Sequence, residues 1–333
     1  MGSGAPDDIP VSAATGIGAM PGEDIAEALR VVAGSLPDLP HLPELPARGP
    51  IADLTGRALA ITADLGFDLQ PAGWRLTDAA GVDHRRARSR LAQDLDVLEE
   101  HLQDYEGRFK VQVAGPWTLA STVEKPRGDK ILSDLGARRD LAQALAEGVR
   151  VHLADVQRRV PRAELVVQVD EPALPFVLGG QVPTASGFSR HRSVRPPAAQ
   201  DALEWVLGAA GDHATVVHCC AAEVPIGLLR RSGAGGVSVD VSALAASAYE
   251  ELATALDEGS QVYLGVLAST GEAVPSAKEP LERALRLLDM LGFDPEEVSG
   301  QLVLTPSCGL AGASAAYAKG VLRALREASA ELG

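Results

Sequence analysis

Short apolar runs alternate with longer amphipathic stretches along most of the chain. Eight runs are predicted to be strands: residues 12–17, 67–69, 109–114, 165–169, 215–218, 236–239, 261–266 and 301–305. Four longer stretches repeat apolar residues every three or four positions, which is typical of helices with one buried face: residues 84–105, 137–159, 280–290 and 313–332. Because the strands are apolar at consecutive positions, we expect them to be buried on both faces, as in a parallel sheet.

This alternation predicts an α/β fold, specifically a single (β/α)8 TIM barrel over residues 11–333. A doubly wound open sheet is disfavoured because no GxGxxG motif opens the first unit. We expect residues 1–10 to be disordered. Residues 36–50, rich in proline, are expected to form an extended surface connection, because proline is excluded from a helix interior.

Composition narrows the classes of partner. The chain of 333 residues has 30 Lys+Arg against 45 Asp+Glu, a formal net charge of -15, which disfavours a nucleic-acid partner. No apolar run approaches the roughly 20 residues that span a bilayer, so no membrane association is expected. The three cysteines, Cys219, Cys220 and Cys308, do not suggest a disulfide framework. They suit the reducing cytoplasm, where thiols remain available as nucleophiles or metal ligands.

Candidate chemistry lies where the predicted strands end, since the active sites of such barrels form at the C-terminal ends of the strands. His218 and Cys220 project to the same side of one strand, and Cys308 follows another. Imidazole and thiolate are ligands that Zn²⁺ prefers. Asp240 ends the next strand and could supply a fourth ligand. The alternatives are buried, inert cysteines, a histidine bonded to backbone and an aspartate that caps a helix.

A second pair of polar residues, Asp170 and Glu171, ends another predicted strand. Two adjacent carboxylates at a buried strand end are costly unless a positive group approaches them. A substrate ammonium group would serve, and so would a salt bridge to an arginine of the barrel.

These motifs, in this order, resemble the C-terminal catalytic barrel of the cobalamin-independent methionine synthase family. The resemblance rests on HxC at residues 218–220, an acidic residue 20 positions later, CGL at 308–310 and VDEPAL at 169–174. Residues 15–21 are similar to the family's first-strand segment. Residues 113–119 resemble a strand end with the sequence GPxT, which the family shares with uroporphyrinogen decarboxylase-like barrels.

The resemblance implies a set of site residues. It implies a Zn²⁺ ion held by four ligands: His218, Cys220, Asp240 and Cys308. It also implies that Asp170, beside Glu171, holds the amino group of homocysteine. Gly18 and Ala19 would lie near the carboxylate group of the same substrate. Trp117 either forms a wall of the substrate pocket or packs as a core aromatic residue.

The implied activity is methyl transfer to a thiol, with homocysteine as acceptor and a folate or a corrinoid as donor. Two family segments have no counterpart: the region expected to follow the second strand reads LQPAGW at residues 69–74, and residues 267–270 lack a histidine.

Two alternatives to this activity therefore stay open. One is a zinc- and thiol-binding homologue without catalysis. The other is a decarboxylase-like enzyme that uses Arg190, Arg192 and Arg195 to hold carboxylates.

Overall fold

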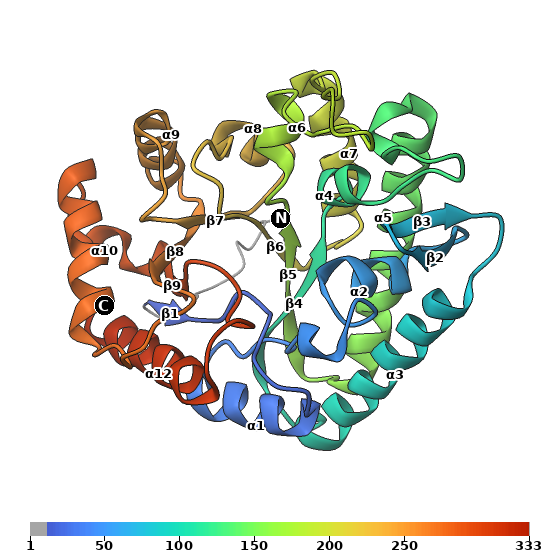
Figure 1. Cartoon of the computed structure of the whole chain (residues 1–333). Coiled ribbons are helices and arrows are strands. Elements are labelled where there is room, and N and C mark those ends of the chain that lie inside the picture. Colours follow the sequence, from blue (N-terminus) through green and yellow to red (C-terminus); the bar gives the residue numbers. More distant parts are fainter. Residues whose placement is uncertain (1–11, 333) are drawn as a thin grey trace, which may run out of the picture.

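A curled parallel sheet lies at the centre of the molecule, and helices surround it (Figure 1). The computed structural model describes residues 12–332. Seven strands follow in the order β1, β9, β8, β7, β6, β5, β4, and each is parallel to its neighbours. Their bounds are β1 (Ala13–Ala14), β4 (Gly107–Ala114), β5 (Ala163–Asp170), β6 (Ala214–Cys219), β7 (Gly236–Asp240), β8 (Gln261–Leu267) and β9 (Leu302–Pro306). The predicted class, an α/β fold of the TIM-barrel type, is confirmed.

The helices form an outer ring around this sheet (Figure 1). The longer ones are α1 (Ile25–Ser35), α3 (Val82–Leu102), α5 (Leu135–Arg159), α7 (Pro196–Gly208), α9 (Ala246–Asp257), α10 (Lys278–Leu291) and α12 (Ala315–Leu332). The shorter ones are α2 (Leu54–Ile61), α4 (Pro116–Thr122), α6 (Leu174–Leu178), α8 (Ile226–Arg231) and α11 (Pro295–Val298). The four helices that the apolar periodicity predicts correspond to α3, α5, α10 and α12.

The eighth strand position belongs to residues 40–44, between the two edge strands β1 and β4. On one side, Leu42 N donates to Lys110 O and Lys110 N donates to Pro40 O, both at 2.9 Å. On the other side, Met20 N donates to Glu44 O at 2.8 Å and Glu44 N donates to Gly18 O at 3.1 Å. The expectation that residues 36–50 form a surface connection is therefore wrong for this part, since residues 39–45 are buried.

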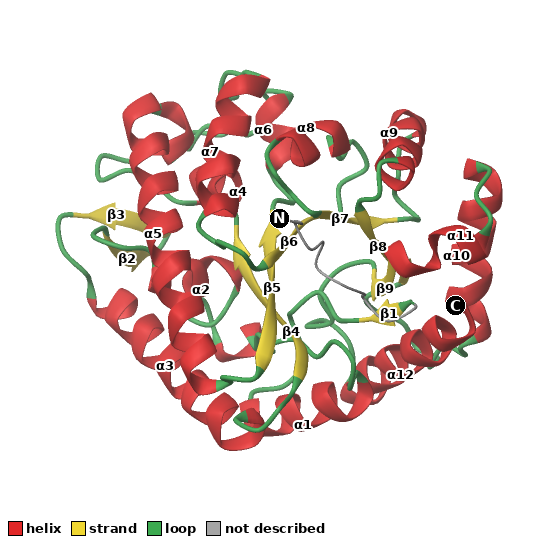
Figure 2. Ribbon diagram, turned by 180° about the vertical axis from the view of Figure 1, so that it is seen from behind, coloured by secondary structure: helices red, strands yellow, loops and turns green. Residues whose placement is uncertain are grey.

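The predicted strand at residues 67–69 exists, but it is not part of the barrel. It belongs to β2 (Gly66–Gln70), which pairs antiparallel with β3 (Gly73–Thr77) in a separate hairpin. This hairpin lies outside the barrel, next to α3 and α5 (Figure 2). The segment after the barrel's second strand is therefore not residues 69–74 but the stretch that follows Glu44.

The strands are buried on both faces, as the consecutive apolar positions predict. One face packs against the helices. The opposite face encloses a small apolar cluster made of Ala13, Leu39, Val166, Val216, Tyr263 and Val303. Since side chains alternate along a strand, the positions that follow on this inner face are 168 and 170 in β5 and 218 in β6. The apolar cluster is thus the floor beneath a polar barrel interior.

None of the helices within residues 12–332 is both long and apolar enough to cross a lipid bilayer. The expectation of disorder for residues 1–10 falls outside the described residues.

Candidate metal centre

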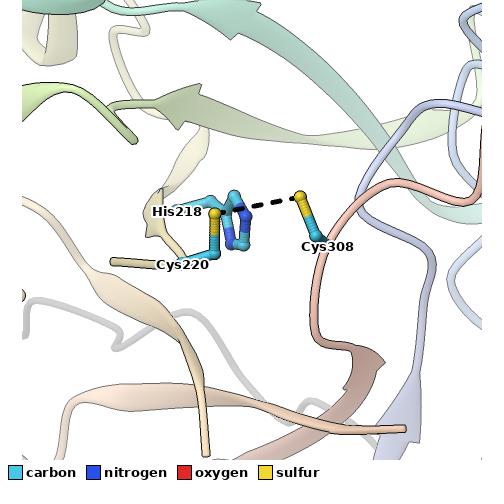
Figure 3. Close-up of side chains that lie close together, drawn as sticks. All are labelled: His218, Cys220 and Cys308. Atoms are coloured by element: carbon cyan, nitrogen blue, oxygen red, sulfur yellow. Dashed lines mark hydrogen bonds between the residues drawn. The ribbon is translucent and has the colours of Figure 1, made fainter. Parts of the chain in front are cut away.

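Two cysteines and one histidine from distant parts of the chain meet at the C-terminal end of the barrel. His218 lies in β6 and Cys220 follows that strand directly, whereas Cys308 follows β9. One ligand atom from each residue lies within 4.8 Å of the other two. The Sγ atoms of Cys220 and Cys308 are 3.8 Å apart (Figure 3). Two other strands separate β6 from β9 in the sheet, so the curl of the barrel is what brings their ends together.

The alternation of side chains along β6 decides which of the adjacent cysteines joins this group. His218 and Cys220 share one side of the strand, and Cys219 projects to the other. Cys219 is fully buried in the main hydrophobic core. Burial raises the pKa of the Cys219 thiol to about 12, so it stays protonated at neutral pH. Cys219 is therefore a packing residue.

The imidazole of His218 is oriented by the neighbouring strand. Its Nδ1 lies 2.9 Å from the hydroxyl oxygen of Ser238, the residue opposite it on β7. The other ring nitrogen, Nε2, is buried and has no hydrogen-bond partner within the described part of the chain. A buried polar atom without a partner costs free energy, so an unpaired Nε2 beside two thiols suggests a ligand. A hydrogen bond to the remote ring nitrogen is also typical of metal-binding histidines.

The donor set fits a zinc ion. Two sulfur atoms that each lie about 2.3 Å from a tetrahedral Zn²⁺ are about 3.8 Å apart, and the observed Sγ–Sγ distance is 3.8 Å. The hydrogen bond from Cys220 lowers the pKa of Cys308 to about 4, with help from His218, whereas the same bond and burial raise the pKa of Cys220. The pair thus favours one thiolate, the form of cysteine that binds metal.

Asp240, the fourth ligand that the resemblance implies, does not belong to this group. The His, Cys, Asp and Glu side chains that lie within 4.8 Å of one another here are His218, Cys220 and Cys308. Oδ1 of Asp240 instead accepts hydrogen bonds from N and Oγ of Ser242, at 2.9 and 2.6 Å. The geometry therefore offers three protein donors, the number typical of catalytic zinc sites, where substrate or water is the fourth ligand.

Asp170 lies beside the metal group. It ends β5 opposite His218 on β6 and is only 5% exposed. Its Oδ1 accepts a hydrogen bond from Nε2 of Gln168 at 2.6 Å. Burial raises the pKa of Asp170 well above its ordinary value, repulsion from Glu44 adds to this, and Lys110 opposes it. A buried carboxylate in this position would gain from a cationic ligand.

Glu44 is a candidate functional residue that the sequence interpretation missed. It is 4% exposed, and its Oε1 has no hydrogen-bond partner among the described residues, although Nε of Arg57 lies 3.4 Å away. Burial raises the pKa of Glu44, and the charge of Arg57 lowers it. One signal was available: His41 and Glu44 interrupt an otherwise apolar segment with leucines at 39, 42 and 45.

The predicted residues Gly18 and Ala19 lie between this segment and the loop that carries Cys308. Gly18 O accepts a hydrogen bond from Glu44 N at 3.1 Å, and Ala19 O accepts one from Leu310 N at 2.7 Å. Gly18 has a φ of 153°, and a Cβ atom there would lie 2.8 Å from the side chain of Gln112. The backbone at residues 18–19 therefore faces the same end of the barrel as the metal group.

Two other predicted substrate contacts have structural roles instead. The carboxylate of Glu171 accepts hydrogen bonds from Trp117 N at 2.9 Å, and from Thr118 N and Thr118 Oγ1, both at 2.8 Å. It thereby caps the first turn of α4, and burial raises its pKa to about 7. The indole of Trp117 is 3% exposed and donates to Ala199 O at 3.0 Å. Glu171 is thus occupied by the backbone of α4, and Trp117 is a core aromatic residue.

The arginines of the decarboxylase alternative lie at the surface. Arg190, Arg192 and Arg195 are exposed in the segment between α6 and α7.

Comparisons with known proteins agree with the fold and with the family that the sequence motifs indicate. The sequence profile of the family described as "Cobalamin-independent synthase, Catalytic domain" matches residues 110–331, more than half of the chain. No curated protein matches the chain at a significant level. Among solved structures, a B12-independent methionine synthase from Shewanella sp. W3-18-1, in complex with selenomethionine, is similar. Its sequence identity is 13%, its TM-score is 0.60, and the alignment covers 97% of this chain and 98% of that chain.

The structural likeness, at 13% identity, speaks for the fold alone. The profile match covers the strands that carry Asp170, His218, Cys220 and Cys308. The chain therefore belongs to the cobalamin-independent synthase family, as the sequence motifs indicate.

Proposed function

We propose that this protein is a zinc-dependent methyltransferase that moves a methyl group to the thiol of homocysteine and so forms methionine. The observation that carries the proposal is the convergence of His218, Cys220 and Cys308 within 4.8 Å at the C-terminal end of the barrel. The Shewanella synthase, which is similar in fold, has been solved in complex with selenomethionine, the selenium analogue of the proposed product.

The metal supplies one function. When bound by His218, Cys220 and Cys308, Zn²⁺ would stabilise the substrate thiol as a thiolate at neutral pH, although a free thiol has a pKa of about 8.5. The chain's own residues prepare this site: Ser238 orients the imidazole through Nδ1, and the two cysteines share a hydrogen bond that favours one thiolate.

Two carboxylates of the barrel suit the amino end of the acceptor. Asp170 and Glu44 are both buried, and burial raises the pKa of each carboxyl group. Repulsion from Glu44 raises the pKa of Asp170 further, so an incoming ammonium group would stabilise the charged carboxylates. We therefore assign them to the substrate's α-ammonium group. The backbone at Gly18 and Ala19 would face the substrate carboxylate.

The reaction itself is a displacement. The thiolate sulfur forms a bond to the methyl carbon, and the bond between that carbon and the donor breaks, with its electron pair leaving on the donor. A site that holds the thiolate and the methyl group in line makes the step effectively unimolecular, which lowers its free-energy barrier. The donor is proposed to be a methylated folate or a methylated corrinoid carrier.

The proposal is tested by metal content and by turnover. Purified protein is expected to contain about one zinc per chain, and His218→Ala, Cys220→Ala and Cys308→Ala are each expected to lose most of it. Cys219→Ala is the matched control, because Cys219 is adjacent in sequence but buried in the core. Methionine formation from homocysteine is then measured with 5-methyltetrahydrofolate and, separately, with methylcobalamin.

Each outcome has a distinct meaning. Zinc binding with methionine formation from either donor supports the proposal and identifies the donor. Zinc and thiol binding without transfer from either donor would instead indicate a homologue that binds but does not catalyse. Wild-type protein without zinc, when purified from metal-replete and reducing medium, would overturn the proposal.

A further inference from the structure

A buried lysine lies beneath the proposed amino-acid pocket. Lys110, on β4, is 0% exposed and is the only buried lysine among residues 12–332. Burying an ammonium group is costly unless it is paired and hydrogen bonded. The metal group does not use Lys110, and nothing in the proposed displacement requires it. Its position therefore needs another explanation.

The contacts of Lys110 form a short relay to Asp170. Nζ of Lys110 donates to Oε1 of Gln168 at 2.7 Å and to Ile17 O at 2.9 Å. Nε2 of Gln168 donates to Oδ1 of Asp170 at 2.6 Å and to Ile17 O at 2.8 Å. Within the described part of the chain, Oδ2 of Asp170 accepts no hydrogen bond from the protein.

The chemistry of the amide gives this relay a direction. A lysine ammonium group has three donors and no acceptor, so it can face only the oxygen end of the Gln168 amide. The NH₂ end must then face Asp170, where it fixes Oδ1. Without Lys110, the amide oxygen would lose its donor, and only the bonds of the NH₂ end to Asp170 and Ile17 O would hold the side chain. Lys110 thus anchors the oxygen end of the Gln168 amide, so that its NH₂ end is held against Oδ1 of Asp170 and the second carboxylate oxygen stays available.

The same relay also links the two ends of the proposed pocket. The carbonyl oxygen of Ile17 accepts from both Lys110 and Gln168, and Ile17 directly precedes Gly18. The pair therefore fixes the distance between the residue 18–19 backbone and Asp170. The positive charge of Lys110 additionally offsets repulsion between Asp170 and Glu44, since it attracts both carboxylates.

We propose that Lys110 is a positioning residue that acts through Gln168 to orient Asp170, and that it thereby sets the selectivity of the site for thiols that carry an ammonium group. This inference rests on the proposed function, because it assumes that a thiol amino acid is the acceptor. It adds a specificity determinant that does not itself touch substrate.

The test compares two thiols that differ in one group. Calorimetry of the zinc-loaded protein gives the dissociation constants of homocysteine and of 4-mercaptobutyrate, which lacks the ammonium group. Lys110→Met keeps most of the length of the side chain and removes the donors. We expect it to lower the preference for homocysteine about tenfold, as the loss of an oriented charged contact implies, with little change for 4-mercaptobutyrate.

Three controls separate positioning from general damage. Lys319→Met, on the exposed face of α12, should leave both constants unchanged. Gln168→Leu should reproduce the loss of preference, and it carries the test if Lys110→Met does not fold. In an Asp170→Asn background, Lys110→Met should cause no further loss, because residues that act as one unit are not additive.

The possible failures are distinguishable. If wild-type protein binds neither thiol, the proposed function itself is overturned. If wild-type protein prefers homocysteine and the variants keep that preference, or lose affinity for both thiols equally, the relay is overturned and the proposed function stands. Tighter binding of homocysteine by Lys110→Met would show that the lysine repels the substrate ammonium group instead.

Discussion

The hydroxyl of Ser238 lies 2.9 Å from Nδ1 of His218, on the adjacent strand of the barrel. This contact fixes the ring and leaves Nε2 as the nitrogen that faces the two cysteines. A residue that contacts no metal itself thus decides which atom of the histidine is available.

Removal of this hydroxyl should weaken zinc binding without abolishing it. Ser238→Ala is expected to lower zinc affinity by roughly 10- to 100-fold, the usual effect of removing a hydrogen bond that orients a ligand. Competition with a chromophoric chelator measures the affinity. Ser242→Ala, which removes a hydrogen bond to Asp240 instead, should leave it unchanged. Equal affinities for Ser238→Ala and wild type would mean that packing alone orients His218.

Glu44 provides a test of the proposed ammonium site that is independent of the relay. Glu44→Gln removes the negative charge and keeps the shape of the side chain. We expect KM for homocysteine to rise by about tenfold or more, because a hydrogen bond to a charged group is worth about 1.5–3 kcal/mol. Zinc content should not change. A fall in kcat with an unchanged KM would contradict the assignment and place Glu44 in the chemical step.

Much of the fold follows from local sequence. The parallel strands and the four long helices are set by apolar periodicity, which each segment carries within itself. The convergence of His218, Cys220 and Cys308 was predictable because all three follow or end strands, and strand ends of a barrel share one face.

Other features depend on partners that local sequence does not reveal. The segment at residues 40–44 is rich in proline, which weakens any strand prediction, and its extended form comes from hydrogen bonds to Gly18, Met20 and Lys110. Glu171 was expected to contact substrate because it adjoins Asp170. Its side chain instead meets the first turn of α4, which is more than 50 residues earlier in the sequence.

The role of Glu171 as a cap yields a prediction about stability. In Glu171→Gln, one carboxylate oxygen becomes an NH₂ donor that faces the N–H and hydroxyl donors of residues 117 and 118. We expect the free energy of unfolding to fall by about 1–3 kcal/mol, the cost of leaving buried polar groups unpaired. Urea denaturation measures it, and Glu164→Gln, on an exposed side chain, is the control. Unchanged stability with a raised KM for homocysteine would restore Glu171 as a substrate contact.

His41 provides a prediction about pH dependence. Its ring is fully buried against Gly16, and burial lowers its pKa well below the ordinary 6.5, with a further contribution from Lys110. Above pH 6.5, His41 is neutral in both the folded and the unfolded chain and contributes no pH dependence. Below pH 6.5, the unfolded chain takes up a proton that the folded chain does not, so stability falls as the pH falls.

The expected loss of stability follows from the single proton that His41 takes up in the unfolded chain. Between pH 7.5 and pH 5.5, His41 should remove about 1.4 kcal/mol from the free energy of unfolding. Urea denaturation at the two pH values should show that wild-type protein loses about 1.4 kcal/mol more stability than His41→Leu does. His101→Gln, at an exposed position on α3, should behave as wild type. The comparison uses the difference between the two pH values, so it is unaffected by any constant cost of replacing the buried ring. An equal loss in wild type and His41→Leu would mean that His41 accepts a proton within the folded barrel.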